Sequence, residues 1–170
     1  MRKIVAVLML VLLLCGCSKQ PEVTAEEVAN AFAGDFSAEA KAVFGDSEAE
    51  MSIVKNGMSI SIIVSSPDEI SGMGIELCDE HVKVTYQGME QEINADSLPE
   101  GTPFLLLREL FEELSEEGEF NIGMKNDKIA AENEDFSAVI SPEDFSLIRA
   151  EFPLYETEFI FSGWEFSDAE

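Results

Sequence analysis

The sequence is poor in positive charge and contains one histidine and three cysteines. Ten lysines and arginines stand against 35 aspartates and glutamates in 170 residues, which gives a formal net charge of -25. Such a surface repels phosphates, so nucleic acid is excluded as a partner. With 46% hydrophobic residues the chain is too apolar for a disordered acidic tail, and we expect one domain with a packed core.

Catalytic motifs are equally sparse. His81 is the only histidine, and no serine-hydrolase, nucleotide-binding or H-E-x-x-H zinc motif accompanies it. We interpret His81 as an exposed turn residue. The acidic runs lack the register of a calcium-binding loop and are typical of solvated faces. We therefore predict no catalytic residue, no metal site and no cofactor, and we expect that the protein is not an enzyme.

The N-terminal apolar run is too short for the roughly 20 residues of a membrane-spanning helix. Arg2 and Lys3 precede eleven apolar residues, Ile4 to Leu14, as in a secretory signal. Leu14-Cys15-Gly16-Cys17 follows and resembles the bacterial lipobox, whose last cysteine receives a diacylglyceryl group. The sequence thus predicts a lipoprotein signal peptide over 1–16. The alternatives are an ordinary secretory signal cut elsewhere and an uncleaved anchor.

Lipidation of Cys17 would determine where the protein lies. Two acyl chains give stable anchoring, since each buried methylene contributes about 0.8 kcal/mol. We expect the protein on the outer face of the cytoplasmic membrane, with a lipidated tether over 17–23 and a single β-rich domain over 24–170. Cys78 is then the only other cysteine of the mature chain, and we expect a buried, inert thiol there.

The first half of the domain has the pattern of a β-meander. Thr24 to Glu27 matches a capping box and predicts a helix to about Phe32. Alternating apolar residues over 36–95 predict about six antiparallel strands. Asn56-Gly57 within them predicts a type I′ hairpin turn, because both residues tolerate positive φ.

An apolar helix follows, and strands resume after it. Thr102 is the expected cap and Pro103 the first helical residue of a helix over 103–117 whose apolar stripe is unusually wide. The last fifty residues contain further short strand patterns. The chain therefore predicts an α+β fold, in which a curved antiparallel sheet of about ten short strands forms a half-barrel covered by one or two helices.

A family resemblance rests on particular segments. These are the Pro67 to Gly72 spacing, Tyr86-Gln87-Gly88-Met89, Leu98-Pro99 and the apolar helix after them. The pattern resembles Gram-positive lipoproteins that are similar to the lipoprotein-carrier fold, which includes the periplasmic lipoprotein chaperone and mycobacterial lipid-binding lipoproteins. The resemblance implies a half-barrel with helices on its concave side and a hydrophobic ligand. Some lipoproteins of this shape instead assist envelope or spore-cortex enzymes.

Two functions follow from these observations. The first is a membrane-anchored lipoprotein that binds a lipid, acyl chain or lipopeptide between the sheet and the helix. The alternative is a non-enzymatic scaffold lipoprotein for an envelope or spore-cortex enzyme, with a filled core and no pocket. For the first, methionines suit an irregular apolar groove. The residues expected to line it are Met58, Ile60, Ile62, Met73, Ile75, Phe104, Leu107 and Phe111.

Overall fold

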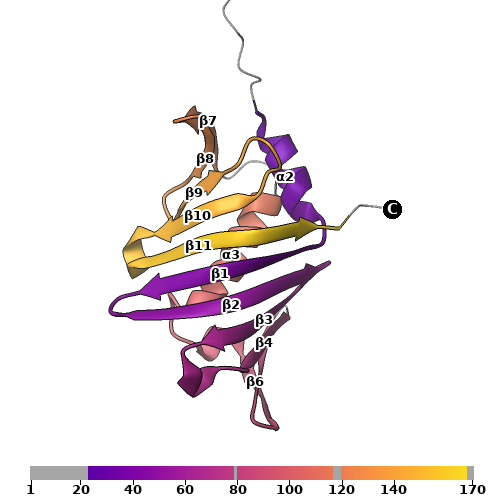
Figure 1. Cartoon of the computed structure of the whole chain (residues 1–170), viewed down its shortest axis with the longest axis vertical. Coiled ribbons are helices and arrows are strands. Elements are labelled where there is room, and N and C mark those ends of the chain that lie inside the picture. The colour runs from indigo at the N-terminus through magenta and orange to yellow at the C-terminus, as the bar shows by residue number, and fades with distance from the viewer. Residues whose placement is uncertain (1–22, 79, 117–119, 168–170) are drawn as a thin grey trace, which may run out of the picture.

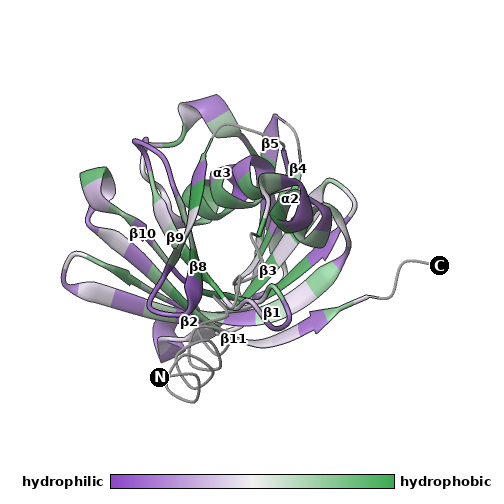
Figure 2. Ribbon diagram, turned by 90° about the horizontal axis from the view of Figure 1, so that it is seen from above, coloured by the Kyte–Doolittle hydropathy of each residue, from purple (hydrophilic) through white to green (hydrophobic). Residues whose placement is uncertain are grey.

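The computed structural model describes residues 23–78, 80–116 and 120–167. Within these residues, eleven strands form one antiparallel sheet, and two α-helices lie against one of its faces (Figure 1). Seen from above, the sheet curves around the helices without closing into a barrel (Figure 2). The predicted α+β class and curved sheet are confirmed, with one strand more than the predicted ten.

The sheet is built from two halves. The first contains β1 (Phe36–Phe44), β2 (Ser47–Asn56), β3 (Ser59–Ser66), β4 (Gly74–Cys78), β5 (His81–Tyr86) and β6 (Met89–Asn94). The second contains β7 (Asn121–Lys125), β8 (Lys128–Glu132), β9 (Ser137–Ile140), β10 (Leu147–Phe152) and β11 (Thr157–Phe166). Successive strands pair within each half, and the first half confirms the meander predicted over 36–95. The halves join where β1 pairs with β11, so that β6 and β7 are the two edges.

Short 3-10 turns link some of these elements. They are η1 (Asp68–Ile70), η2 (Ala95–Ser97) and η3 (Pro153–Tyr155). The helix α2 (Ala25–Ala33) begins as predicted, because the Thr24 hydroxyl accepts from the backbone N–H of Glu27 and the Glu27 carboxylate accepts from that of Thr24. The capping box therefore fixes the helix start.

The hairpin between β2 and β3 is present, but its turn is shifted by one residue. Asn56 is still paired, opposite Ser59, and the loop consists of Gly57 and Met58. Of these two only Gly57 has a positive φ, of 57°. That fits a type II′ turn, in which the first central residue alone needs the left-handed region. The prediction of a type I′ turn at Asn56-Gly57 was therefore wrong, and Met58 lies at the tip.

The second helix, α3 (Pro103–Ser115), lies in the concave side of the sheet. Pro103 occupies the first helical position as predicted. Thr102 does not cap through its side chain, because its hydroxyl donates to the carbonyl of Pro99 at 2.6 Å. Six residues of α3 are buried, which is why it can fill the concavity: Leu105, Leu106, Leu107, Leu110, Phe111 and Leu114.

The cysteine predictions have separate outcomes. Cys78 ends β4 with its side chain exposed, so the prediction of a buried thiol was wrong. Alternation explains the difference, because Ile75 and Leu77 face the core and place Cys78 on the opposite face. Cys17 and the signal peptide lie outside the described residues.

Candidate ligand groove

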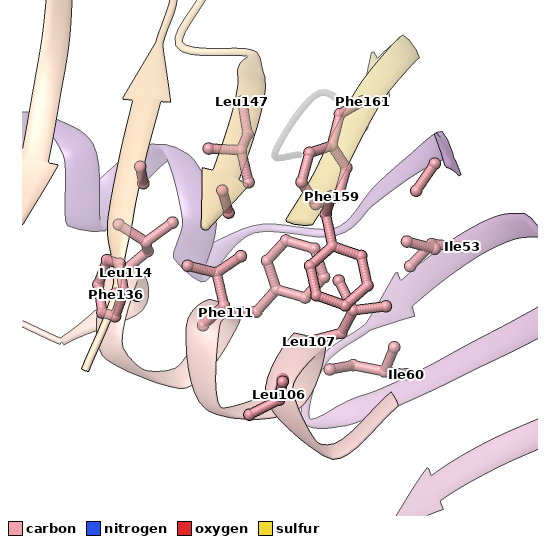
Figure 3. Close-up of a cluster of buried hydrophobic side chains, with 14 of the residues drawn as sticks. Ile53, Ile60, Leu106, Leu107, Phe111, Leu114, Phe136, Leu147, Phe159 and Phe161 are labelled. Atoms are coloured by element: carbon pink, nitrogen blue, oxygen red, sulfur yellow. The ribbon is translucent and has the colours of Figure 1, made fainter. Parts of the chain in front are cut away.

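Side chains fill the space between α3 and the sheet. Leu107 and Phe111 are fully buried and face the sheet residues Phe159 and Phe161 (Figure 3). Aromatic rings fill this space next to the C-terminal half of α3. The centroid of the Phe111 ring lies 5.0 Å from that of Phe36 and 6.2 Å from that of Phe161. The concave interior is therefore a packed core around α3.

The eight residues expected to line a ligand cavity have three different environments. Met73 and Phe104 are partly buried against the core, and Met58 is 85% exposed. The other five belong to the core itself: Ile60, Ile62, Ile75, Leu107 and Phe111. Three of the eight, Met58, Ile60 and Phe111, meet at a single hollow at the rim of the core.

That hollow is an open groove of about 360 Å³ between α3 and the tip of the β2–β3 hairpin. We call it the hairpin groove. Its large apolar residues are Met58, Ile60 and Phe111, and since Ile60 and Phe111 are buried, they supply its floor. The full lining is Ala33, Lys55, Gly57, Met58, Ile60, Arg108, Phe111, Glu112, Ser115 and Glu116.

Lys55 connects the groove to the end of α2. Its side chain points inward, and its ammonium donates hydrogen bonds of 3.1 Å to the carbonyls of Ala33 and Gly34. The Asp35 carboxylate accepts from the backbone N–H of Gly57 at 2.7 Å. The last turn of α2 and the hairpin tip are therefore held together, which positions one wall of the groove. Burial lowers the pKa of the Lys55 ammonium from its ordinary 10.5, and the Asp35 carboxylate partly opposes the shift.

The opposite wall comes from the exposed side of α3. The Arg108 guanidinium Nε lies 3.7 Å from the Glu112 carboxylate one turn later. Glu116 follows at the end of the helix. The groove thus has an apolar floor between walls that carry cations from Lys55 and Arg108 and carboxylates from α3. This arrangement suits an amphiphilic molecule rather than a purely apolar one.

Replacing Lys55 with methionine tests the link between α2 and the hairpin. We expect a loss of about 1 kcal/mol at pH 7, because the two carbonyls lose a charged donor. The folded state binds the Lys55 proton less tightly than the unfolded state, so the stability linked to this group rises with pH in the interval below 10.5. In urea unfolding at pH 7 and pH 10, the free energy of unfolding of the wild type relative to that of Lys55→Met should therefore be larger at pH 10.

Lys41 provides the control for this prediction. It is a β1 lysine whose ammonium lies 2.7 Å from the Glu48 carboxylate, and its pKa is raised by that hydrogen bond and by the charge of Glu48. The stability linked to Lys41 is fully present below 10.5 and is lost only as the pH rises above that value. The stability of the wild type relative to Lys41→Met should not rise between pH 7 and pH 10. A rise equal to that measured against Lys55→Met would contradict the assignment to Lys55.

His81 and the acidic residues are the other candidates for catalysis or metal binding that the sequence offers. His81 is exposed, as interpreted from the sequence, but it is the first residue of β5 rather than a turn residue, and its Nε2 lies 3.9 Å from the Glu92 carboxylate. It lies opposite Cys78 in the β4–β5 register. Among the described residues, no group of three or more His, Cys, Asp or Glu could hold a metal ion. Within the same residues, no helix has the length and apolar character to cross a membrane.

Comparison with known proteins addresses the fold. No protein-family model matches the sequence, and no curated protein is detectably similar to it. An uncharacterized conserved protein from Thermus thermophilus has a similar structure, with a TM-score of 0.53 and 7% identity over 84% of this chain and 85% of that one. This similarity shows a shared fold and no more.

Two further structures are similar at lower scores. A LolA superfamily protein from Nitrosomonas europaea has a TM-score of 0.43 and 11% identity over 87% of this chain and 96% of that one. A chain from the complex of the CwlD amidase with the GerS lipoprotein of Clostridioides difficile has a TM-score of 0.45 and 15% identity over 89% of this chain and 98% of that one. The curved antiparallel sheet with helices on its concave side, which the predicted carrier-like fold requires, is present in the structure.

Proposed function

We propose that the protein is a lipid-anchored, extracytoplasmic binding protein without catalytic activity, whose hairpin groove takes the apolar part of an amphiphilic ligand. The observation that carries this proposal is Met58, which lies 85% exposed at the rim of a floor formed by Ile60 and Phe111. A flexible thioether beside buried apolar side chains can adapt to an acyl chain or lipopeptide. The groove volume of about 360 Å³ falls at the lower end of the ~300–1,000 Å³ of ligand sites.

The groove replaces the deeper cavity expected from the sequence. Side chains of α3 fill the concave interior, so a ligand there would have to displace Leu107 or Phe111, both of which are fully buried. The groove needs no such rearrangement. Lys55 and Arg108 share the groove with the carboxylates of Glu112 and Glu116, so its walls favour a ligand with a polar end next to its apolar part.

Anchoring at Cys17 completes the proposal. The six tether residues from Ser18 to Val23 reach at most about 20 Å, since an extended residue spans roughly 3.3–3.6 Å. The domain would then remain close to the outer face of the cytoplasmic membrane, where amphiphiles are concentrated. Its acidic surface is repelled by anionic headgroups, so the lipid rather than the surface would hold the protein there.

A Met58→Asp variant tests the groove. We expect the affinity for cis-parinaric acid, a fluorescent fatty acid, to fall about tenfold, since an apolar contact is lost and a carboxylate is added beside the chain. The measurement is a fluorescence titration of a soluble form that starts after the signal peptide and carries Cys17→Ser.

Met89→Asp is the matched control, because Met89 is 68% exposed and lies next to another hairpin turn, away from the groove. Binding should be unchanged in this variant. Equal weakening by both substitutions, or no binding by the unsubstituted protein, would refute the groove as a ligand site.

A second role is favoured by the filled interior. A core occupied by α3 is the arrangement that the alternative from the sequence requires, in which the lipoprotein binds a protein partner instead of carrying a ligand. This role places the functional surface on the outside of the domain. It is compatible with the hairpin groove, because the groove occupies only one end of the α3 side of the sheet.

A further inference from the structure

The convex face of the sheet, which the helices do not cover, has few charges at its centre. Figure 1 looks onto this face. Strand register places Ser52, Ile63, Gly74 and Thr85 in one row across β2 to β5, and Val54 and Ser61 side by side in the next. In a chain with 26% charged residues, such an uncharged group is unusual. We call these residues the convex patch: Ser52, Val54, Ser61, Ile63, Gly74 and Thr85.

The apolar side chains of the patch stand between small neighbours. Ile63 is 57% exposed because Ser52 on one side and Gly74 on the other are too short to cover it. A hollow of about 250 Å³ adjoins Ile63 over β3 to β5. Gly74 cannot be enlarged without disturbing this surface, since a Cβ there would lie 2.5 Å from the Thr85 hydroxyl. The patch therefore offers both a protruding group and a hollow to a partner.

Carboxylates surround the patch. Glu39 pairs with Ser52 across β1 and β2, and Glu76 pairs with Ser61 across β4 and β3. The two lysines nearby are engaged, since Lys41 lies 2.7 Å from Glu48 and Lys83 lies 3.1 Å from Glu90. The rim therefore has an excess of negative charge around an uncharged centre.

We propose that the convex patch docks an envelope protein whose contact surface has an apolar centre and a basic rim. Protein interfaces combine an apolar core with a polar rim, and complementary charge selects the partner. A second copy of this chain would bring one acidic rim against another, and an anionic membrane would be repelled in the same way. The proposal rests on the interaction role above, to which it gives a surface and a partner chemistry.

Site-specific photocrosslinking tests the proposal in the full-length protein. We would place p-benzoylphenylalanine at position 52, beside Ile63, and irradiate membranes isolated from the producing cells. The same probe at position 154, the exposed Leu154 of η3, reports contacts elsewhere. The patch predicts an adduct at position 52 whose crosslinked peptide is apolar and flanked by lysine or arginine. Its yield should fall several-fold between 0.05 and 0.5 M salt, estimated roughly from the shorter screening length.

Matched substitutions make the result specific. Ile63→Ser should reduce the adduct about tenfold, because the protruding apolar group is removed from an exposed position. Ile160→Ser is the control, since Ile160 is exposed on the same face but lies between Lys41 and Arg149. Its adduct yield should be unchanged.

The remaining outcomes overturn the proposal in distinguishable ways. An adduct between two copies of the chain, an adduct with lipid, or a yield unaffected by Ile63→Ser would exclude the convex patch as this docking site. Protein adducts from position 154 alone would leave the interaction role and remove the patch. No protein adduct from either position would count against both, once circular dichroism shows the probe-bearing proteins to be folded.

Discussion

Replacing Cys17 with alanine is expected to abolish incorporation of a clickable fatty acid and to reduce the fraction of the protein that sediments with membranes. The physical reason is that two acyl chains bury enough methylenes for stable anchoring, at about 0.8 kcal/mol each, whereas the acidic domain is repelled by the bilayer surface. The measurement is in-gel fluorescence after metabolic labelling, combined with fractionation of the cells.

Cys15→Ala is the control for this prediction. Cys15 lies two residues before the predicted lipid site and follows the bulky Leu14, which fits poorly beside a cleavage site. Labelling should therefore persist in Cys15→Ala. If the unsubstituted protein is not labelled and Cys17→Ala fractionates as it does, the proposed anchoring and the location built on it are wrong.

Phe111→Ala is expected to destabilise the domain by about 3–5 kcal/mol, the usual loss when a buried phenylalanine becomes alanine. Phe111 is fully buried in α3, and its ring packs against those of Phe32, Phe36, Phe161 and Trp164. For a domain of this size the loss corresponds to a decrease in Tm of roughly 10 °C. Thermal and urea unfolding followed by circular dichroism give both values.

Leu154→Ala is the comparison, because Leu154 is an exposed apolar residue on η3. It should change the stability by no more than about 0.5 kcal/mol. A similarly small effect of Phe111→Ala would mean that α3 does not pack against the sheet as described. It would reopen the concave interior as a ligand cavity.

Periodicity made the fold predictable. Alternation along β1 to β4 was strong because each of these strands has one buried and one more solvated face. The wide apolar stripe of α3 correctly indicated a helix enclosed on most sides. The type of hairpin turn was not predictable, since Asn56 and Gly57 favour one turn locally while the pairing of Asn56 with Ser59 selects another.

The groove was predictable only in part. Met58, Ile60 and Phe111 were named from the sequence. The sequence left open whether α3 fills the space between it and the sheet, because the ligand-binding function required a cavity there and the scaffold function a filled core. Lys55 was missed, although alternation places it on the same face as Met51 and Ile53, which is an unusual position for a lysine. Arg108 could not have been assigned, because its place in the groove depends on how α3 is rotated against the hairpin.

The pairing of β1 with β11 has a consequence for biogenesis. These neighbours come from opposite ends of the domain, so the middle of the sheet cannot be completed until the C-terminal strand is available. Contacts between such distant segments slow folding. Until β11 pairs with it, β1 has an unpaired edge that is prone to aggregation. If the chain is exported N-terminus first, the proposed lipid site at Cys17 would therefore leave the secretion channel before the domain could complete its sheet.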